Sequence, residues 1–254
     1  MPAVVPGRLI AMMSGSFAAL LILLTAAAAV VAWLGGLGVG RATVTAAVRA
    51  VVQLGGVSLI IAAVLRSWWS TVAFIVMMFA VAAVTSARRI GSARYAWAAA
   101  IPIAAAVLPV GVAIAIARPV PWTPLGVLPV AGILIGGAMT ATSLAGRRAL
   151  DELQARAGEY EAALAIGLLT RDAVLLVCRP TAGRALVPAL DQTRTVGLVT
   201  LPGAFVGVML GGGSAVQAGA VQVLVLIGLL AVEAAAVVVT VELVAAQVLQ
   251  PRTV

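Results

Sequence analysis

Seven long apolar runs dominate this chain of 254 residues and limit the folds that it can adopt. Each run is long enough to cross the hydrocarbon core of a bilayer as a helix, which takes about 20 residues. The composition agrees, because 63% of the residues are apolar and only 9% are charged, far from the range of water-soluble domains. Backbone N–H and C=O groups in lipid must be paired within their own segment, which favours helices. The sequence therefore predicts an all-α, polytopic membrane protein with about seven transmembrane helices.

The expected spans are 17–34, 43–65, 68–84, 95–117, 125–145, 185–210 and 216–248. The first run could also be read as a signal peptide, but it is long for one and the chain behind it is equally apolar, so an uncleaved span is favoured. Pro102 and Pro109 are expected to kink the fourth span. No second domain or internal repeat is evident, so residues 1–254 are interpreted as a single transmembrane domain.

The segment between the fifth and sixth spans, residues 147–184, has the composition of a water-exposed structure. It holds six of the sixteen arginines and five of the eight acidic residues. Apolar residues recur every three or four positions from Leu150 to Leu168, which is the pattern of an amphipathic helix. Gly167 should interrupt this helix, and a second short helix should run from Thr170 until Pro180 stops it. A helical hairpin between membrane spans is where a membrane protein meets a soluble partner.

The arginines indicate which way the chain crosses the membrane. If the hairpin is cytoplasmic, eleven arginines lie on its side of the membrane and three lie on the other. The eleven are the six of the hairpin with Arg41, Arg88, Arg89, Arg94 and Arg252, and the three are Arg8, Arg66 and Arg118. Cytoplasmic loops are enriched in arginine, so we expect an external N-terminus and a cytoplasmic C-terminus in the cell (inner or plasma) membrane.

Residue types that the chain lacks exclude several kinds of chemistry. It contains no lysine, so it has no Gly-x4-Gly-Lys-Ser/Thr phosphate loop with which to bind ATP. It contains no histidine, the commonest metal ligand and general base, and its single cysteine, Cys178, permits no internal disulfide. The net charge of +8 does not indicate a nucleic-acid partner, because the arginines lie at the ends of apolar runs.

Among the polar residues within the predicted spans, six stand out: Arg49, Gln53, Asp191, Arg194, Gln222 and Glu233. Charged groups at such depths are costly and usually face the interior of a bundle or a water-filled path. We therefore interpret the six as candidates for a translocation pathway. The alternative for Arg49, Asp191 and Arg194 is that they reach the interface or pair only to hold helices together. Glu233 lies in the middle of its span, where this alternative is weaker.

The sixth predicted span contains Leu201-Pro202-Gly203 near its middle. Proline removes a backbone donor and glycine loosens the turn, so carbonyl groups are expected to be freed there. Broken helices of this kind commonly line binding sites in transporters, although simple proline kinks also occur in spans without such a role. We include Pro202 and Gly203 in the candidate pathway. Gly203, Gly207 and Gly211 also form a small-residue ridge of the kind that permits close packing, for example in a dimer.

Within the hairpin, Glu161-Ala162-Ala163 followed by Gly167 matches the EAA-x3-G cytoplasmic loop of ABC-transporter permeases. The surrounding pattern comprises Arg49-x3-Gln53, Pro129-Val-Ala-Gly132, Val187-Pro-Ala-Leu-Asp191, Leu201-Pro-Gly203 and Gln222. Together these motifs resemble the FetB-type permeases. That family consists of ABC membrane subunits implicated in the export of iron or other metals, with plant relatives linked to aluminium tolerance.

The resemblance implies a permease homodimer that works with a separately encoded ABC ATPase. That partner would bind ATP and Mg, so the chain itself would need no cofactor and catalyse no reaction. By matching position, Glu161, Ala162, Ala163 and Gly167 would form the element that couples to the ATPase. The sequence does not identify the substrate or its ligands. The alternative is a secondary transporter or channel that does not use ATP, in which Asp191 and Glu233 carry protons or ions.

Overall fold

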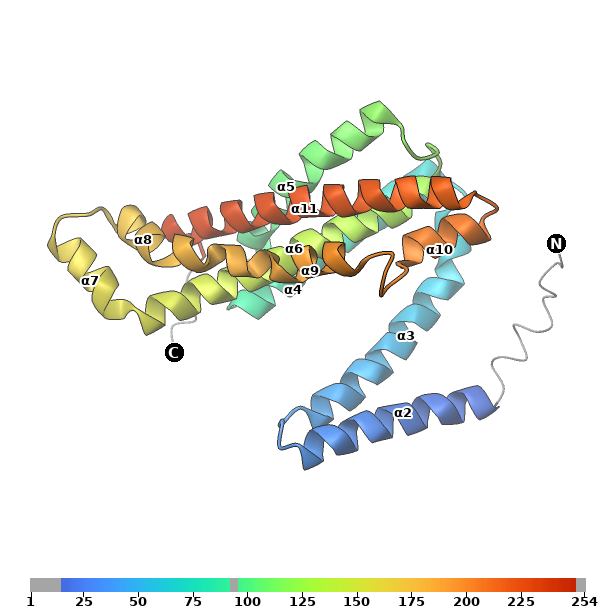
Figure 1. Cartoon of the computed structure of the whole chain (residues 1–254), viewed down its shortest axis with the longest axis horizontal. Coiled ribbons are helices and arrows are strands. Elements are labelled where there is room, and N and C mark those ends of the chain that lie inside the picture. Colours follow the sequence, from blue (N-terminus) through green and yellow to red (C-terminus); the bar gives the residue numbers. More distant parts are fainter. Residues whose placement is uncertain (1–14, 92–95, 250–254) are drawn as a thin grey trace. The chain divides into compact units, whose positions relative to one another are not determined.

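The computed structural model describes residues 15–91 and 96–249, and in these ranges the chain is built of helices joined by turns (Figure 1). Seven segments are long and apolar enough to cross a membrane: Gly15–Leu34, Gly40–Val64, Trp68–Ile90, Ala96–Ala117, Pro124–Ala155, Thr170–Thr195 and Ala215–Ala245. The predicted all-α architecture with seven spans is therefore confirmed. The contacts divide the chain into two compact units, one ending at Val64 and the other beginning at Leu65.

The first unit is a pair of helices, α2 (Gly15–Leu34) and α3 (Gly40–Val64). The turn between them contains Gly36 and Gly38, whose φ angles of 65° and 69° are in the left-handed region that favours glycine. Nearly all side chains of both helices are exposed in the single chain, and most of these are apolar. Such surfaces are typical of helices that contact lipid or further protein.

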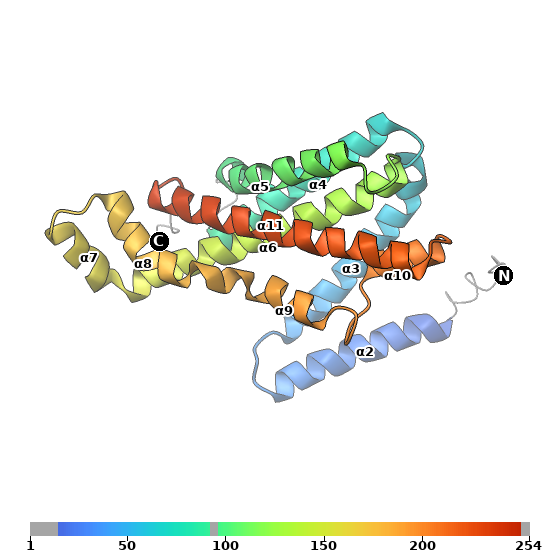
Figure 2. The ribbon, with the colours of Figure 1, turned by 45° about the horizontal axis from the view of Figure 1, so that its top comes forward.

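The second unit is a bundle centred on two long helices that lie side by side, α6 (Pro124–Ala155) and α11 (Ala215–Ala245) (Figures 1 and 2). Two further helices, α4 (Trp68–Ile90) and α5 (Ala96–Ala117), pack on this pair and on each other. The core of the bundle is rich in small residues, among them the fully buried Ala138 and Ala236. Small side chains let helix backbones approach closely, which is how helices associate when lipid supplies no hydrophobic drive.

The hairpin between the fifth and sixth spans differs in detail from the prediction. The amphipathic helix expected from Leu150 is divided at Arg156, whose backbone (φ −115°, ψ 34°) separates α6 from α7 (Ala157–Ala165). Gly167 then reverses the chain with a φ of 93°, as predicted. The next helix, α8 (Thr170–Ala182), continues past Pro180, where we expected it to stop. Five residues of α8 are buried: Ala173, Val174, Leu175, Val177 and Cys178. This packing outweighs the one backbone hydrogen bond that proline removes.

The limits predicted for the sixth span, 185–210, are wrong, because the candidate span in this region is Thr170–Thr195 and includes α8, which the sequence assigned to the water-exposed hairpin. The predicted stretch is also not one helix. After α8 the chain forms a 3-10 turn, η2 (Gly183–Leu186), then α9 (Val187–Thr195), a non-helical stretch at 196–202 and α10 (Gly203–Leu210). The expectation of a break near Pro202 is confirmed, but the break is wider than a kink. Gly197 adopts a φ of 80°, and Pro202 cannot donate a backbone hydrogen bond, so the helical ladder stops on both sides.

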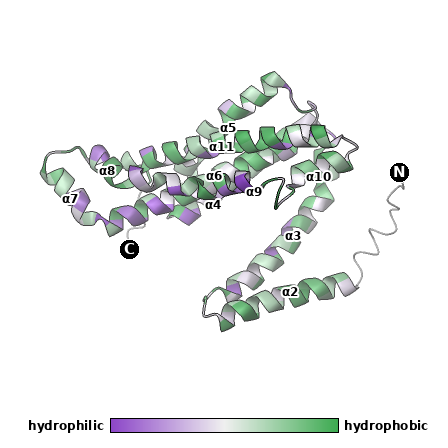
Figure 3. Cartoon of the chain, in the orientation of Figure 1, coloured by the Kyte–Doolittle hydropathy of each residue, from purple (hydrophilic) through white to green (hydrophobic). Residues whose placement is uncertain are grey.

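Hydropathy follows this architecture. Figure 3 shows hydrophilic residues on α7, α8 and α9 and on the neighbouring end of α6, whereas α2 and α10 are predominantly hydrophobic. The charged residues of the second unit thus gather at the hairpin end of the long α6–α11 pair. This end is expected to leave the membrane, because α6 continues for ten residues beyond the predicted end of its span at residue 145.

Candidate functional site

Glu233 is a buried acid in the middle of α11. Its residue is 8% exposed, and it lies on the buried face of that helix together with Gln222, Leu229 and Ala236. The carboxyl group faces α6 at Gly137, where a Cβ atom would lie 2.9 Å from Oε1 of Glu233 and would collide with Cδ1 of Leu229. The absence of a side chain at Gly137 therefore lets α11 bring its carboxyl group against the backbone of α6.

Within the part of the chain that the structure describes, several polar groups of α6 and α11 have no hydrogen-bond partner. Among the described residues, no hydrogen bond or ion pair is formed by the Glu233 side chain. Oε1 of Gln222, which is 6% exposed, and Oγ1 of the buried Thr142 on α6 also have no hydrogen-bond partner in the described part of the chain. Buried polar groups are usually satisfied, and exceptions in membrane proteins mark ion or substrate paths. The sequence correctly placed Gln222 and Glu233 on one buried face.

Asp191 and Arg194 form an ion pair on α9, with Oδ1 and Nη1 3.4 Å apart. The pairing on one helical face agrees with the prediction. Their side chains are 58% and 78% exposed, so neither is buried within the second unit. Pro202 and Gly203 lie next along the chain, where Pro202 caps α10 and Gly203 begins it. The structure thus brings these residues to the broken segment and not to the buried face of α11.

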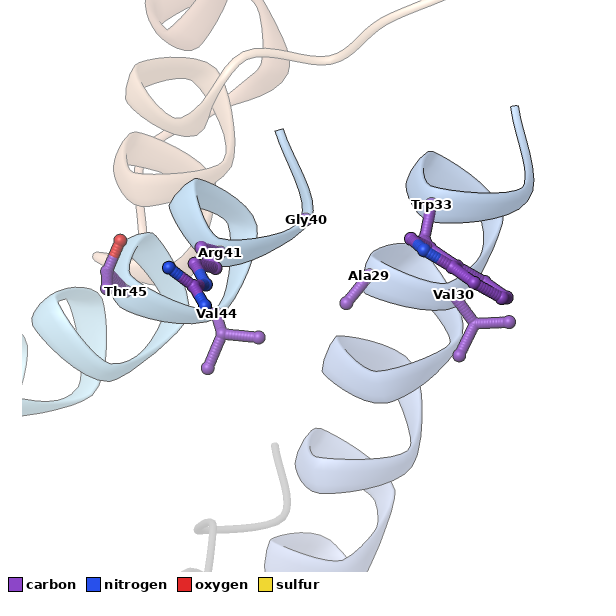
Figure 4. Close-up of a pocket in the computed structure, with 7 residues that line it drawn as sticks. All are labelled: Ala29, Val30, Trp33, Gly40, Arg41, Val44 and Thr45. Atoms are coloured by element: carbon purple, nitrogen blue, oxygen red, sulfur yellow. The ribbon is translucent and has the colours of Figure 1, made fainter. Parts of the chain in front are cut away.

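Arg49 and Gln53 lie one turn apart on α3 of the first unit, and both are exposed. This unit also contains an apolar cleft of about 560 Å³ between α2 and α3 (Figure 4). The cleft is lined by Ala29, Val30, Trp33, Gly40, Arg41, Val44 and Thr45. Neither Arg49 nor Gln53 lines it, so the cleft is separate from the predicted pathway residues.

The hairpin presents the EAA-x3-G segment on α7. Glu161 and Ala162 are exposed, whereas Ala163 is 3% exposed and anchors the helix. Arg156 fixes the base of α7 with two contacts. Its Nε donates to Oε1 of Glu159 at 2.8 Å, and its Nη1 donates to the carbonyl oxygen of Val177 on α8 at 3.3 Å. The guanidinium group of Arg156 also lowers the pKa of Glu159, chiefly through the hydrogen bond that it donates to the Glu159 carboxylate.

Sequence reasoning did not single out Glu242, near the end of α11. Its carboxylate contacts two arginines of α8, Arg171 and Arg179. A signal for this contact exists in the sequence, because residues eight positions apart lie close to one face of a helix and can share an acidic partner. Gly137 was also missed as a neighbour of Glu233, because only the packing of α6 on α11 shows which glycine faces the acid.

Apolar helices around a buried acid, with a polar hairpin at one end, define a multi-pass membrane protein with polar groups inside its bundle. The model of the uncharacterised protein family UPF0014 matches residues 16–249, and the chain belongs to this family. No solved structure matches the chain at a significant level.

Three relatives illustrate the family. The UPF0014 membrane protein STAR2 of Oryza sativa subsp. japonica is 38% identical over 109 residues, which is 43% of this chain and 38% of STAR2. A UPF0014 membrane protein of Synechocystis sp. is 30% identical over 211 residues, covering 80% of this chain and 81% of that protein. The probable iron export permease protein FetB of Escherichia coli is 33% identical over 108 residues, covering 41% and 40%. The resemblance to FetB-type permeases is thus confirmed, although the match spans only about two fifths of the first relatives' length.

Proposed function

We propose that this chain is the membrane-spanning permease subunit of an ABC transporter that exports a metal ion or another small solute. The observation that carries the proposal is the α7 hairpin. Glu161 and Ala162 of the EAA-x3-G segment are exposed on it, whereas Ala163 is buried. The chain then changes direction at Gly167. Membership of a family that includes a probable iron export permease supports the same reading. The energy would come from a separate ATPase subunit that binds ATP and Mg and docks on the hairpin.

In this proposal two copies of the chain form the permease, and both compact units of each copy belong to one transmembrane domain. The glycine ridge of α10 supports a homodimer, because added Cβ atoms at Gly203 and Gly207 would meet nothing within 4 Å. No other described residue therefore packs on these two positions, which could accept another helix. The hairpin would lie in the cytoplasm, with the N-terminus outside and the C-terminus inside the cell membrane, as the arginine bias indicates.

The translocation pathway would use the polar groups inside the bundle. Glu233 offers a negative group and Gln222 a neutral oxygen on one buried face of α11. A carboxylate and amide oxygens suit a cation better than an anion. Asp191, Arg194 and the broken segment before Gly203 would line the path from α9 and α10, whereas Arg49 and Gln53 of the first unit are candidates on the sequence alone. Non-helical backbone at membrane depth is tolerated where it lines such a path or is covered by protein.

A second candidate is a secondary transporter that moves ions without ATP. The observation that favours it is Glu233 itself, because a buried acid that forms no ion pair with the other described residues can carry a proton. The two candidate functions differ in their energy source, but in both of them Glu233 takes part in transport.

The deciding experiment is reconstitution. The chain is co-expressed with the ABC ATPase encoded nearest to its gene, purified through a tag on the permease alone and placed in vesicles. We expect the ATPase to co-purify, and we expect Fe²⁺ or another divalent cation to stimulate ATP hydrolysis and to move only when ATP is present. Cation movement driven by a pH gradient, with no ATPase bound, would favour the secondary transporter and overturn the proposal.

A further inference from the structure

Glu242 joins the last turns of α11 to α8. Its Oε2 lies 2.5 Å from Nη2 of Arg171, and its Oε1 lies 3.1 Å from Nη2 of Arg179. The two arginines thus bind the two oxygens of one carboxylate. Asp172, next to Arg171 on α8, gives that arginine a second partner at 3.6 Å. We name the contact of Glu242 with Arg171 and Arg179 the α8–α11 clamp.

The clamp lies beside an apolar cluster that holds the same helices. Val174 and Cys178 of α8 pack in this cluster with Val241 and Val244 of α11, and all four are buried. Residues of α6 complete it, and the thiol of Cys178 donates to the carbonyl oxygen of Ala149. Arg156 ties the start of α7 to α8 as described above. The hairpin and the ends of α6 and α11 therefore form one packed body.

The two long helices are attached to this body in different ways. The end of α6 continues into the hairpin through the chain itself, whereas α11 approaches it only by non-covalent contacts, of which the clamp is the charged part. Both helices also meet at the buried contact between Gly137 and Glu233. The stretch of α11 from Glu233 to Glu242 contains neither glycine nor proline, so it is expected to be stiff over its length of about 14 Å.

We propose that Glu242 is a positioning residue through which movement of the hairpin is passed to α11, and so to the surroundings of Glu233. The inference rests on the proposed function, in which the ATPase moves the hairpin. With the clamp closed, α8 carries α11 along with α6. With the clamp broken, the non-directional apolar contacts still hold α8 beside α11 but no longer fix its register, so α11 can slip while α6 follows the hairpin, and the environment of Glu233 changes less with each ATP cycle.

Glu242→Gln tests this in vesicles that contain the full complex with its ATPase. The variant removes the charge that both arginines bind but keeps the size of the side chain. We expect ATPase binding and ATP hydrolysis to be retained, because Glu242 lies outside the α7 segment proposed to dock. We expect the amount of Fe²⁺ moved per ATP hydrolysed to fall at least tenfold. Glu242→Asp, which keeps the charge, should restore most of this ratio.

The matched control is Asp172→Asn. It also removes a carboxylate that binds Arg171, but that pair lies within α8 and does not reach α11. Its ratio of Fe²⁺ to ATP should stay within twofold of the wild type. If Glu242→Gln yields no monodisperse protein, Arg179→Gln is used in its place. This variant leaves the contact between Glu242 and Arg171 intact, so we expect a partial loss in the amount of Fe²⁺ moved per ATP hydrolysed.

The outcomes separate this inference from the function on which it rests. A wild-type chain that binds no ATPase overturns the proposed function and the inference with it. A wild-type complex that transports, together with a Glu242→Gln variant that moves as much Fe²⁺ per ATP, overturns the inference alone. An equal loss in Asp172→Asn also overturns it, because the effect would then come from charge on α8 and not from the link to α11.

Discussion

The carboxyl group of Glu233 lies against the backbone of Gly137, on the neighbouring helix α6, so closely that a Cβ atom at position 137 would lie 2.9 Å from Oε1. The same atom would collide with Leu229, which is buried on α11. The close approach of α6 and α11 at this point thus depends on a glycine. The buried acid therefore lies at a close contact between α6 and α11.

Gly137→Ala should therefore destabilise the protein, because Leu229 and Glu233 must both move in a packed bundle. Overpacking of this kind costs about 1–3 kcal/mol. Thermal unfolding in detergent measures the change. The control is Gly136→Ala, since a Cβ atom there meets nothing within 4 Å. That variant should be neutral or more stable by roughly 0.5–1 kcal/mol, because alanine is the better helix former. Equal unfolding temperatures for the two variants would contradict the packing described.

Glu233→Gln should abolish cation transport while leaving assembly intact. The substitution preserves the shape of a side chain that forms no ion pair within residues 15–91 and 96–249, so the folded bundle is expected to persist. It removes the negative charge to which a cation would bind. Cation-stimulated ATP hydrolysis should disappear, and basal hydrolysis should remain. Measuring both in one vesicle preparation, corrected for the amount of permease, checks this. Transport at the wild-type rate would remove Glu233 from the pathway.

Glu161→Arg should prevent docking of the ATPase. Glu161 is exposed on α7 and forms no ion pair in the described part of the chain, so the reversal is expected to leave the permease folded. Reversing a charge in a docked interface leaves charges unpaired and costs more than about 2 kcal/mol, or at least about 30-fold in affinity. Co-purification of the ATPase measures the loss. Gln154→Arg, exposed on α6 outside the motif, is the control and should bind normally.

The orientation of the chain is tested by reporter fusions. A reporter placed after Val254 and one placed in the hairpin after Gly167 should both report the cytoplasm, because the arginine-rich loops are expected to stay inside. A reporter at Gly212, between α10 and α11, should report the external side. An external signal from the hairpin would exclude the docking role proposed for Glu161.

The number and approximate limits of most spans could be predicted from the sequence, because the cost of unpaired backbone groups in lipid leaves long apolar runs little choice but helix. The reversal at Gly167 and the break before Gly203 were visible as local features, because glycine and proline act on the backbone of their own turn. Gln222 and Glu233 could be assigned to one face of a helix by spacing alone. These properties depend on neighbours within one turn or one run of the chain.

Tertiary packing decided the rest. Pro180 lies inside α8 because burial of that helix against α11 outweighs one lost hydrogen bond. The residues around Pro180 do not show that α11 packs there, so the sequence predicted a helix end. Asp191 and Arg194 pair on α9 with exposed side chains, and no local pattern in the sequence shows how far this short helix lies from the core. The partners Gly137 for Glu233 and Arg171 for Glu242 lie 96 and 71 residues away. Only the packing of α6, α8 and α11 brings these side chains together, since helical periodicity shows which face of a helix is buried and not what lies against it.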